Sequence, residues 1–254
     1  YRLVRKFGNY KQRQKYLELQ GRLDLSEFDD VFNEMNDIEE KQVIDLPAEF
    51  ISLCNKHLPL SSQTPLDYLR GRGLSKNEIL KWKIGYCRKG KYAGRIIIPS
   101  FNDDGDCNYF IARSYVGHGR RYLNPPCGRD IIFNELNIDW DEPVIIVEGV
   151  FDAVVAGDNA IPILGSTLRE DSKLFQAIAI HDTPVYIALD PDAEKKAHWI
   201  IRSLMKYDLE IKKLNIGSYE DIGSMSPDIF RERLNKAENI DGDMYFLEKQ
   251  LRNL

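Results

Sequence analysis

Three acidic side chains stand directly after two apolar stretches of this sequence. Glu148 follows Val144–Val147, and Asp190 and Asp192 follow the segment PVYIAL at residues 184–189. Apolar runs that do not alternate with polar residues are typical of parallel strands buried on both faces. Because open α/β sheets bind ligands at the carboxyl ends of their strands, we expect these three carboxylates to lie together at one sheet edge.

Crowded carboxylates favour a bound cation, because they repel one another in its absence. Mg²⁺ or Mn²⁺ suits such a site, since both take oxygen ligands, and Mg²⁺ is usually held by one or two carboxylates together with substrate phosphates. In the alternative interpretation, Glu148 interacts with a helix N-terminus and the two aspartates merely flank a turn. The presence of acids after both strands favours the metal site.

The residues around the acids indicate β-strand and α-helix units. Gly149 permits a tight turn, residues 151–155 read as the opening of a helix, and residues 193–207 continue at helical spacing. Between these units, Gly165-Ser166-Thr167 follows another apolar segment. Its hydroxyls either bind a phosphate at a helix N-terminus or cap that helix, and the sequence leaves both interpretations open.

The composition is that of a globular protein. With 254 residues, the chain can form one large domain or two small ones. No apolar run approaches a membrane span, so we expect no membrane partner, and Tyr1–Lys6 is not a secretion signal. The absence of an initiator Met predicts a fragment or a processed form. The four cysteines form no CxxC pair, which favours reduced thiols and no zinc in this fragment.

The charge is unevenly distributed. The net charge of −5 alone argues against a nucleic-acid partner. Residues 81–129, however, contain 10 cations and 3 anions, which is typical of a surface that binds polyphosphate or nucleic acid. The cations are Lys81, Lys83, Arg88, Lys89, Lys91, Arg95, Arg113, Arg120, Arg121 and Arg129.

The pattern along the chain predicts four parts. A basic arm and an acidic helical linker occupy residues 1–45, and a mixed α/β region occupies residues 46–134. Within that region we expect a strand ended by Pro99, a hairpin turn at residues 102–106, and a proline-stiffened loop with Arg121 and Asn124. A parallel-sheet domain follows at residues 135–223. Residues 224–254 are expected to be mainly helical, with a helix start at Ser226-Pro227.

Several motifs, taken in order, resemble the catalytic core of bacterial DnaG-type DNA primases, including phage versions. The resemblance covers residues 58–225, and the order of the motifs is more specific than any one of them. The motifs are GLSKNEILKWKIGYC, GRIIIPSFNDDGDCNYFIARSY, RYLNPP, IIFNEL, VIIVEGVFDAV, ILGST and ALDPDAEKKA.

The resemblance implies a fold, an activity and a set of roles. The fold is a small mixed α/β subdomain followed by a TOPRIM domain, and the activity is synthesis of short RNA primers on single-stranded DNA from ribonucleoside triphosphates. Glu148 matches the TOPRIM glutamate, and Asp190 and Asp192 match its DxD pair. The residues that face nucleotide or template are Arg95, Arg113, Arg121, Asn124 and Lys91. A replicative helicase in a primosome is the implied partner, and the implied location is the cytoplasm, or the host cytoplasm for a phage protein.

The sequence departs from the family in two places. Where the family carries a further acidic pair, Glu220-Asp221-Ile222-Gly223 offers Asp221 at the first position and Gly223 at the second, so we expect one metal site to be poorer in protein ligands. The zinc ribbon and a sizeable helicase-binding domain are missing, which truncation would explain. Two rival hypotheses stay open: a TOPRIM nuclease or topoisomerase that cleaves phosphodiesters, and an inactive scaffold in a replication complex.

Overall fold

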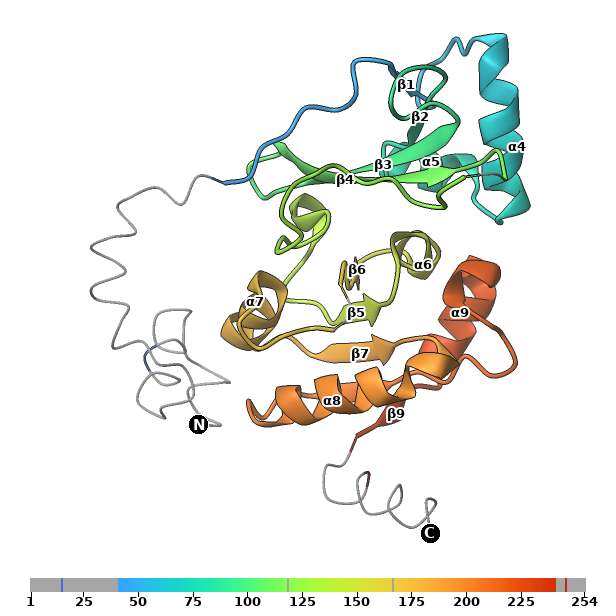
Figure 1. Ribbon diagram of the computed structural model, residues 1–254. Helices are drawn as coiled ribbons and strands as arrows, with labels where there is room; N and C mark the ends of the chain where they lie inside the picture. Colours follow the sequence, from blue (N-terminus) through green and yellow to red (C-terminus); the bar gives the residue numbers. More distant parts are fainter. Residues whose placement is uncertain (1–14, 16–40, 118, 166, 241–244, 246–254) are drawn as a thin grey trace.

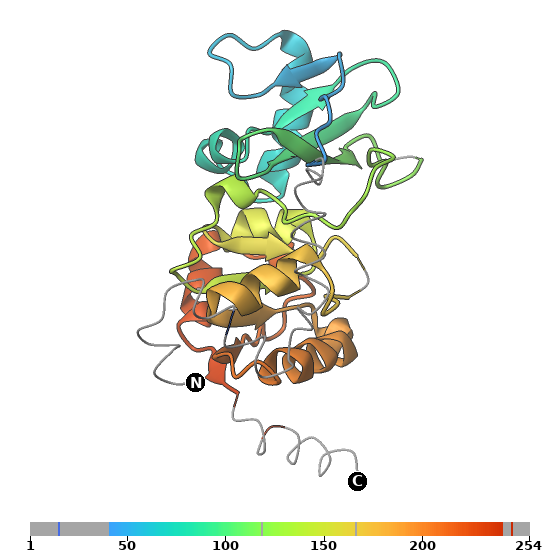
Figure 2. The same cartoon turned by 90° about the vertical axis from the view of Figure 1, so that its left-hand side faces the viewer.

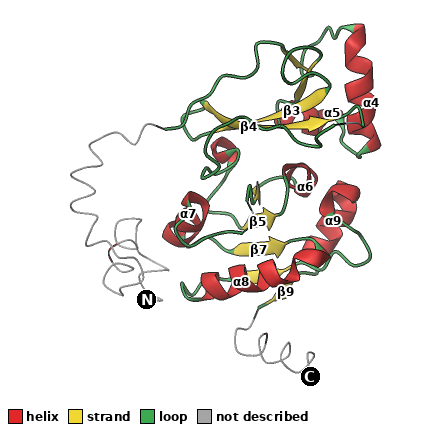
Figure 3. Cartoon of the chain, in the orientation of Figure 1, coloured by secondary structure: helices red, strands yellow, loops and turns green. Residues whose placement is uncertain are grey.

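A computed structural model of the chain describes residues 15, 41–117, 119–165, 167–240 and 245. The expected arm and linker at residues 1–45 therefore lie mostly outside the described residues. The described chain forms a four-stranded antiparallel sheet followed by a five-stranded, mostly parallel sheet (Figures 1 and 3). No helix among the described residues is both long enough and apolar enough to cross a membrane.

The first sheet has the order β1-β2-β3-β4. Its strands are β1 (Phe50–Ser52), β2 (Gly85–Cys87), β3 (Arg95–Phe101) and β4 (Cys107–Ser114). The turn Asn102–Asp106 joins β3 and β4, as the sequence predicts. Between β1 and β2 lie η1 (Leu60–Ser62), α4 (Gln63–Gly71) and α5 (Lys76–Lys81), and Ser75 caps α5 in a capping box with Glu78.

The prediction that Pro99 ends its strand is wrong. β3 continues to Phe101, with Pro99 opposite Phe110 of β4. The other neighbour, β2, pairs only with Arg95–Ile97. Pro99 therefore lies where β3 has a single partner, and a strand with one free edge accommodates proline without losing a ladder hydrogen bond.

The second sheet has the order β6-β5-β7-β8-β9. β5 (Val144–Val147), β6 (Ala160–Pro162), β7 (Val185–Ala188) and β8 (Ile211–Lys213) are parallel, and β9 (Glu238–Asn239) is antiparallel to β8. The expectation that the two acid-bearing strands share one sheet is confirmed, because β5 and β7 are neighbours. Strand β9 was not expected in a segment predicted to be mainly helical. The helical segments of this part are η2 (Glu135–Asn137), α6 (Val150–Ala156), α7 (Lys173–His181), η3 (Pro191–Ala193), α8 (Glu194–Met205), η4 (Ile222–Ser224) and α9 (Pro227–Leu234).

Both faces of the second sheet are covered. Ile146 packs with residues of α7 and α8 on one face, whereas Val147 packs with α6 and α9 on the other. The cluster around Val147 continues into the first sheet, where it includes Ile96 and Ile111. Each fully buried side chain of this size contributes about 1.5–3 kcal/mol. Figures 1 and 2 accordingly show the first sheet stacked above α6, with α8 on the opposite side of the second sheet.

Candidate active site

Glu148, Asp190 and Asp192 come together at the carboxyl edge of the second sheet. Val147 of β5 lies opposite Ala188 of β7, so the chain leaves both strands at the same edge. One carboxylate oxygen from each of the three acids lies within 4.8 Å of the other two. Glu148 and Asp190 are partly buried, and Asp192 is exposed. The juxtaposition expected from the two apolar strands is therefore present.

The oxygen atoms of this cluster suit a cation. Oε2 of Glu148, Oδ1 of Asp190 and Oδ1 of Asp221 are buried and have no hydrogen-bond partner among the described residues. Buried polar atoms normally have a partner, and an unpartnered one costs about 1–3 kcal/mol. Oε1 of Glu148 accepts a 2.7 Å hydrogen bond from Nζ of Lys196. The donor set consists only of oxygen atoms, which hard divalent cations prefer.

The crowding of negative charge shows most clearly at Asp190. Burial, the largest cause, and the charges of Asp152, Glu148, Asp221 and Asp192 raise the pKa of Asp190 to about 7. A neighbouring cation would lower that pKa, because an opposite charge favours the ionised carboxyl.

Asp221 reaches the edge of this cluster from a different element. It immediately precedes η4, in the segment that follows β8. Its negative charge contributes to the raised pKa of both Asp152 and Asp190. It is not one of the three acids whose oxygens lie within 4.8 Å of one another. The structure thus brings Asp221 near the site while leaving it outside the closest group.

Asp152 is a site residue that the sequence reasoning missed. Its side chain is 9% exposed, and burial is the largest cause of its raised pKa. Oδ2 accepts a 2.8 Å hydrogen bond from the N–H of Gly149, and Oδ1 accepts a 2.9 Å bond from the N–H of Gly223. Asp152 therefore ties the turn after Glu148 to the loop after Asp221. The available signal was an acid inside the apolar opening of a helix.

Arg113 is buried between aromatic side chains. It is 7% exposed, and it donates 2.6 Å hydrogen bonds from Nε to the Tyr68 hydroxyl and from Nη1 to the Tyr122 hydroxyl. Its guanidinium carbon lies 5.1 Å from the ring centroid of Phe151. Phe151 is the third residue after Glu148, so Arg113 links the first sheet to the acidic edge of the second.

Arg72 approaches the same ring and was not singled out by the sequence. Its guanidinium carbon lies 4.8 Å from the centroid of Phe151, and Nε is buried with no hydrogen-bond partner among the described residues. A Cβ placed on Gly223 would lie 3.5 Å from Nη2 of Arg72, which locates this guanidinium beside the loop of Asp221. The guanidinium groups of Arg72 and Arg113 therefore both lie against the ring of Phe151, close to the acidic edge of the second sheet.

The remaining predicted basic and amide residues divide into two groups. Arg95 donates to the carbonyls of Ala112, Arg120 and Arg121, and Asn124 accepts from the N–H of Ala112, so both residues hold the local backbone. Arg121 is exposed, with its guanidinium carbon 5.9 Å from the ring centroid of Tyr122. Lys91 is also exposed, with Nζ 5.2 Å from the ring centroid of Tyr92.

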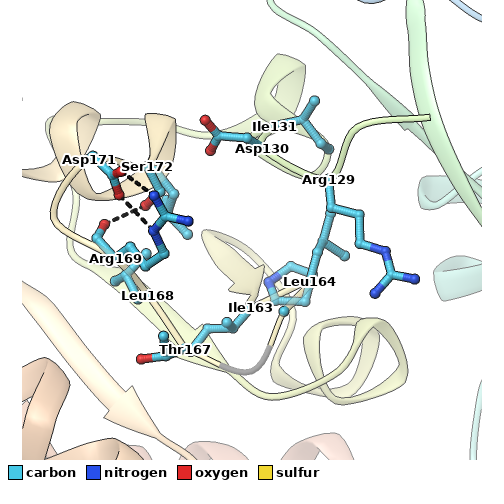
Figure 4. Close-up of a pocket in the computed structure, with 13 residues that line it drawn as sticks. Arg129, Asp130, Ile131, Ile163, Leu164, Thr167, Leu168, Arg169, Asp171 and Ser172 are labelled. Atoms are coloured by element: carbon cyan, nitrogen blue, oxygen red, sulfur yellow. Dashed lines mark hydrogen bonds and ion pairs between the residues drawn. The ribbon is translucent and has the colours of Figure 1, made fainter.

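The loop with Gly165 and Thr167 does not lead directly into a helix. Helix α7 begins at Lys173 and is capped by Ser172, whose hydroxyl accepts from the N–H of Phe175, so Thr167 does not cap it. Ser166 lies outside the described residues. Gly165 and Thr167 line a cavity of about 300 Å³. Figure 4 shows Arg129 across this cavity from the ion pair between Arg169 and Asp171.

The fold is that of the catalytic domain of DnaG-type primases. A DNA primase domain from Pseudomonas aeruginosa superposes with a TM-score of 0.63 at 19% identity, covering 78% of each chain. The Aquifex aeolicus primase, with zinc-binding and RNA polymerase domains, has a TM-score of 0.62 at 19% identity and covers 94% of this chain and 74% of its own. A DnaG primase catalytic domain bound to single-stranded DNA has a TM-score of 0.60 at 17% identity, covering 71% of this chain and 74% of its own.

Sequence comparison also finds similarity to a DNA primase. The chain is 23% identical over 185 residues to the DNA primase of Thermotoga maritima, a match that covers 65% of this chain. It spans about a third of that relative's length, 32%. No family model matches the chain.

Proposed function

We propose that this chain carries the catalytic centre of a DNA primase, which synthesises short RNA primers on single-stranded DNA from ribonucleoside triphosphates. The observation that carries the proposal is a set of buried oxygens on Glu148, Asp190 and Asp221 that have no partner in the described part of the chain. They lie at one edge of a sheet with a primase fold. Such oxygens can coordinate a divalent cation that also binds the phosphates of a substrate.

Glu148, Asp190 and Asp192 would hold Mg²⁺ or Mn²⁺, with Asp221 assisting. When bound, the metal supplies charge stabilisation for the attacking 3′-oxygen and the departing pyrophosphate in nucleotidyl transfer. Asp152 fixes the two loops that carry Glu148 and Asp221 through its two backbone hydrogen bonds. Lys196 orients Glu148, because its ammonium is bonded to Oε1.

The arginines supply the complementary charge. Arg72 and Arg113 would contact the triphosphate, since a guanidinium fork matches phosphate oxygens. Arg121 and Lys91 are exposed on the first subdomain and would contact the template backbone. Arg95 and Asn124 would hold the loop that carries Arg121 in place, because their side chains form hydrogen bonds with backbone atoms. We retain residues 46–134 and 135–223 as the proposed subdomains.

Primer synthesis with labelled ribonucleotides on single-stranded DNA tests this function. Metal-dependent RNA products from the wild-type chain, absent from an Asp190→Ala variant, are the expected result. Cleavage of the DNA without synthesis would instead support a nuclease, which would use the same acidic centre. Association with a replicative helicase belongs to the proposal through the family resemblance, and a pull-down with that helicase tests it separately.

A further inference from the structure

Three solvent-facing residues of α8 and its C-cap residue, Lys206, form a stripe that the proposed centre does not use. Lys195, Trp199, Arg202 and Lys206 are exposed, and at about 100° per residue they fall within an arc of about 60° on one helix face. We call this set the α8 stripe. The opposite face of the helix, with Ala197, Ile200, Ile201 and Leu204, packs into the core.

Packing does not account for the tryptophan of this stripe. Trp199 is 43% exposed, whereas Trp82 in the first subdomain is 4% exposed. A large aromatic ring left in water on a helix already anchored by its other face is a candidate contact for a ligand.

The cations of the stripe are largely uncompensated. Neither Lys195 nor Arg202 forms an ion pair with any residue that the structure describes, and only Lys206 is paired, with Glu170. Lys196, the neighbour of Lys195, instead faces Glu148. The stripe therefore presents positive charge on a chain whose net charge is −5.

The position of α8 connects the stripe to the acidic centre. The helix starts two residues after Asp192, and its stripe extends about 16 Å along the axis, at 1.5 Å per residue. In Figures 1 and 2, α8 lies on the side of the second sheet opposite the first subdomain, which carries Arg113 and Arg121. Because α8 begins beside the acidic centre, its exposed face is within reach of a strand bound there.

We propose that the α8 stripe binds single-stranded DNA as it leaves the acidic centre, with a base stacked on Trp199 and phosphates at Lys195 and Arg202. An exposed aromatic ring between cations favours single strands, because every unpaired base offers a face for stacking and every linkage offers a charge. A duplex hides those base faces. The identity of the strand as the template rests on the proposed function, whereas its binding does not.

Equilibrium binding of a fluorescein-labelled oligothymidylate of about 12 nucleotides tests the stripe without nucleotides or metal. Trp199→Ala should weaken binding about tenfold, within the range known for loss of one stacked base. Trp199→Phe should retain most of the affinity. An abasic oligomer of equal length should bind wild type and Trp199→Ala equally, because it has no base to stack.

The charges are tested by the salt dependence of the same equilibrium. Lys195→Ala with Arg202→Ala should reduce the slope of log K against log salt by about 1.4, since each single-strand phosphate contact contributes about 0.7. Lys195→Arg with Arg202→Lys keeps both charges and should keep the slope. Unchanged affinity and slope in the alanine variants would overturn the proposal, as would an equal loss by Trp199→Ala on the abasic oligomer.

The test also separates the stripe from its alternatives and from the proposed function. If Trp199→Ala alters self-association in sedimentation but not DNA binding, the face is a protein interface and the proposal is wrong. If the wild-type chain makes no RNA, but the variants still differ from it in DNA binding as described, only the primase function is refuted. If the wild-type chain makes RNA, but the variants bind DNA as it does, only the proposed DNA binding by the α8 stripe is refuted.

Discussion

Oδ1 of Asp152 accepts a 2.9 Å hydrogen bond from the N–H of Gly223, which joins helix α6 to the loop that carries Asp221. The other oxygen of the same carboxylate holds the N–H of Gly149, next to Glu148. Asp152 therefore holds two separate segments, one of them 71 residues further along the chain. A glycine at position 223 leaves room for it, since a Cβ there would lie 2.9 Å from Oδ1 of Asp152.

Replacing Asp152 with asparagine should destabilise the fold. An asparagine has one acceptor oxygen, so either Gly149 or Gly223 loses its partner, at a cost of about 1–3 kcal/mol. Urea unfolding at neutral pH measures the change. The matched control is Asp141→Asn, an exposed loop aspartate whose replacement should stay within about 0.5 kcal/mol. Equal stability of both variants would show that the two hydrogen bonds of Asp152 contribute nothing.

The metal-free protein should lose stability as pH rises past neutral because of Asp190. Its folded pKa of about 7 is above the ordinary value of 3.8, so its contribution to stability is fully present below pH 4 and is lost as pH rises through 7. Asp190→Asn removes this titration. In chelator-treated samples, the variant should therefore melt above wild type at pH 8, and the difference should shrink towards pH 5. A constant difference across that range would contradict the raised pKa.

The arginines should separate into stabilising and purely binding residues. Arg113 is buried and hydrogen-bonded to two tyrosine hydroxyls, whereas Arg121 is exposed. Arg113→Met leaves the hydroxyls of Tyr68 and Tyr122 without their shared donor, so a loss of about 1–3 kcal/mol is expected. Arg121→Ala should leave the unfolding free energy within about 0.5 kcal/mol. It should weaken DNA binding, and identical unfolding curves for both variants would argue against this division.

Phe151 should matter for nucleotide binding through the two guanidinium groups beside it. Phe151→Leu keeps an apolar side chain in the core but removes the ring that Arg72 and Arg113 approach at 4.8 and 5.1 Å. Cation–π contacts contribute about 0.5–2 kcal/mol each. We expect KM for ribonucleotides to rise several-fold while Mn²⁺ affinity stays unchanged. A fall in Mn²⁺ affinity with constant KM would place the ring in support of the carboxylates instead.

The acidic edge was predictable because its signals are local. Val144–Val147 and the apolar run before Asp190 each identify a buried strand, and parallel strands deliver their next residues to one edge. The local signal of Asp152, an acid in the apolar opening of a helix, does not reveal its role, because that role depends on a loop 71 residues away. Arg113 was found as a cation, but its burial depends on contacts with Tyr68 of α4 and with Tyr122 after β4, which the sequence does not place.

The second sheet was likewise only partly predictable. Its parallel core follows from apolar runs, whereas β9 has just two residues, Glu238 and Asn239, and both are exposed. A strand of that composition carries no hydrophobic pattern and forms only because β8 offers a free edge. The extension of β3 past Pro99 was also not predictable from its own residues. Proline is tolerated there because β2 pairs only as far as Ile97, which leaves one edge of β3 free.

Metal-dependent dinucleotide synthesis on a single-stranded template tests the central claim most directly. Wild type should form dinucleotides with Mg²⁺ or Mn²⁺ and none with chelator. Asp190→Ala and Asp192→Ala should lose synthesis by at least a hundredfold, because each removes a carboxylate from the proposed cation site. Glu148→Gln should be impaired as well, and all variants are compared below their measured melting temperatures. Wild-type rates from the two aspartate variants would place the catalytic centre elsewhere and contradict this account.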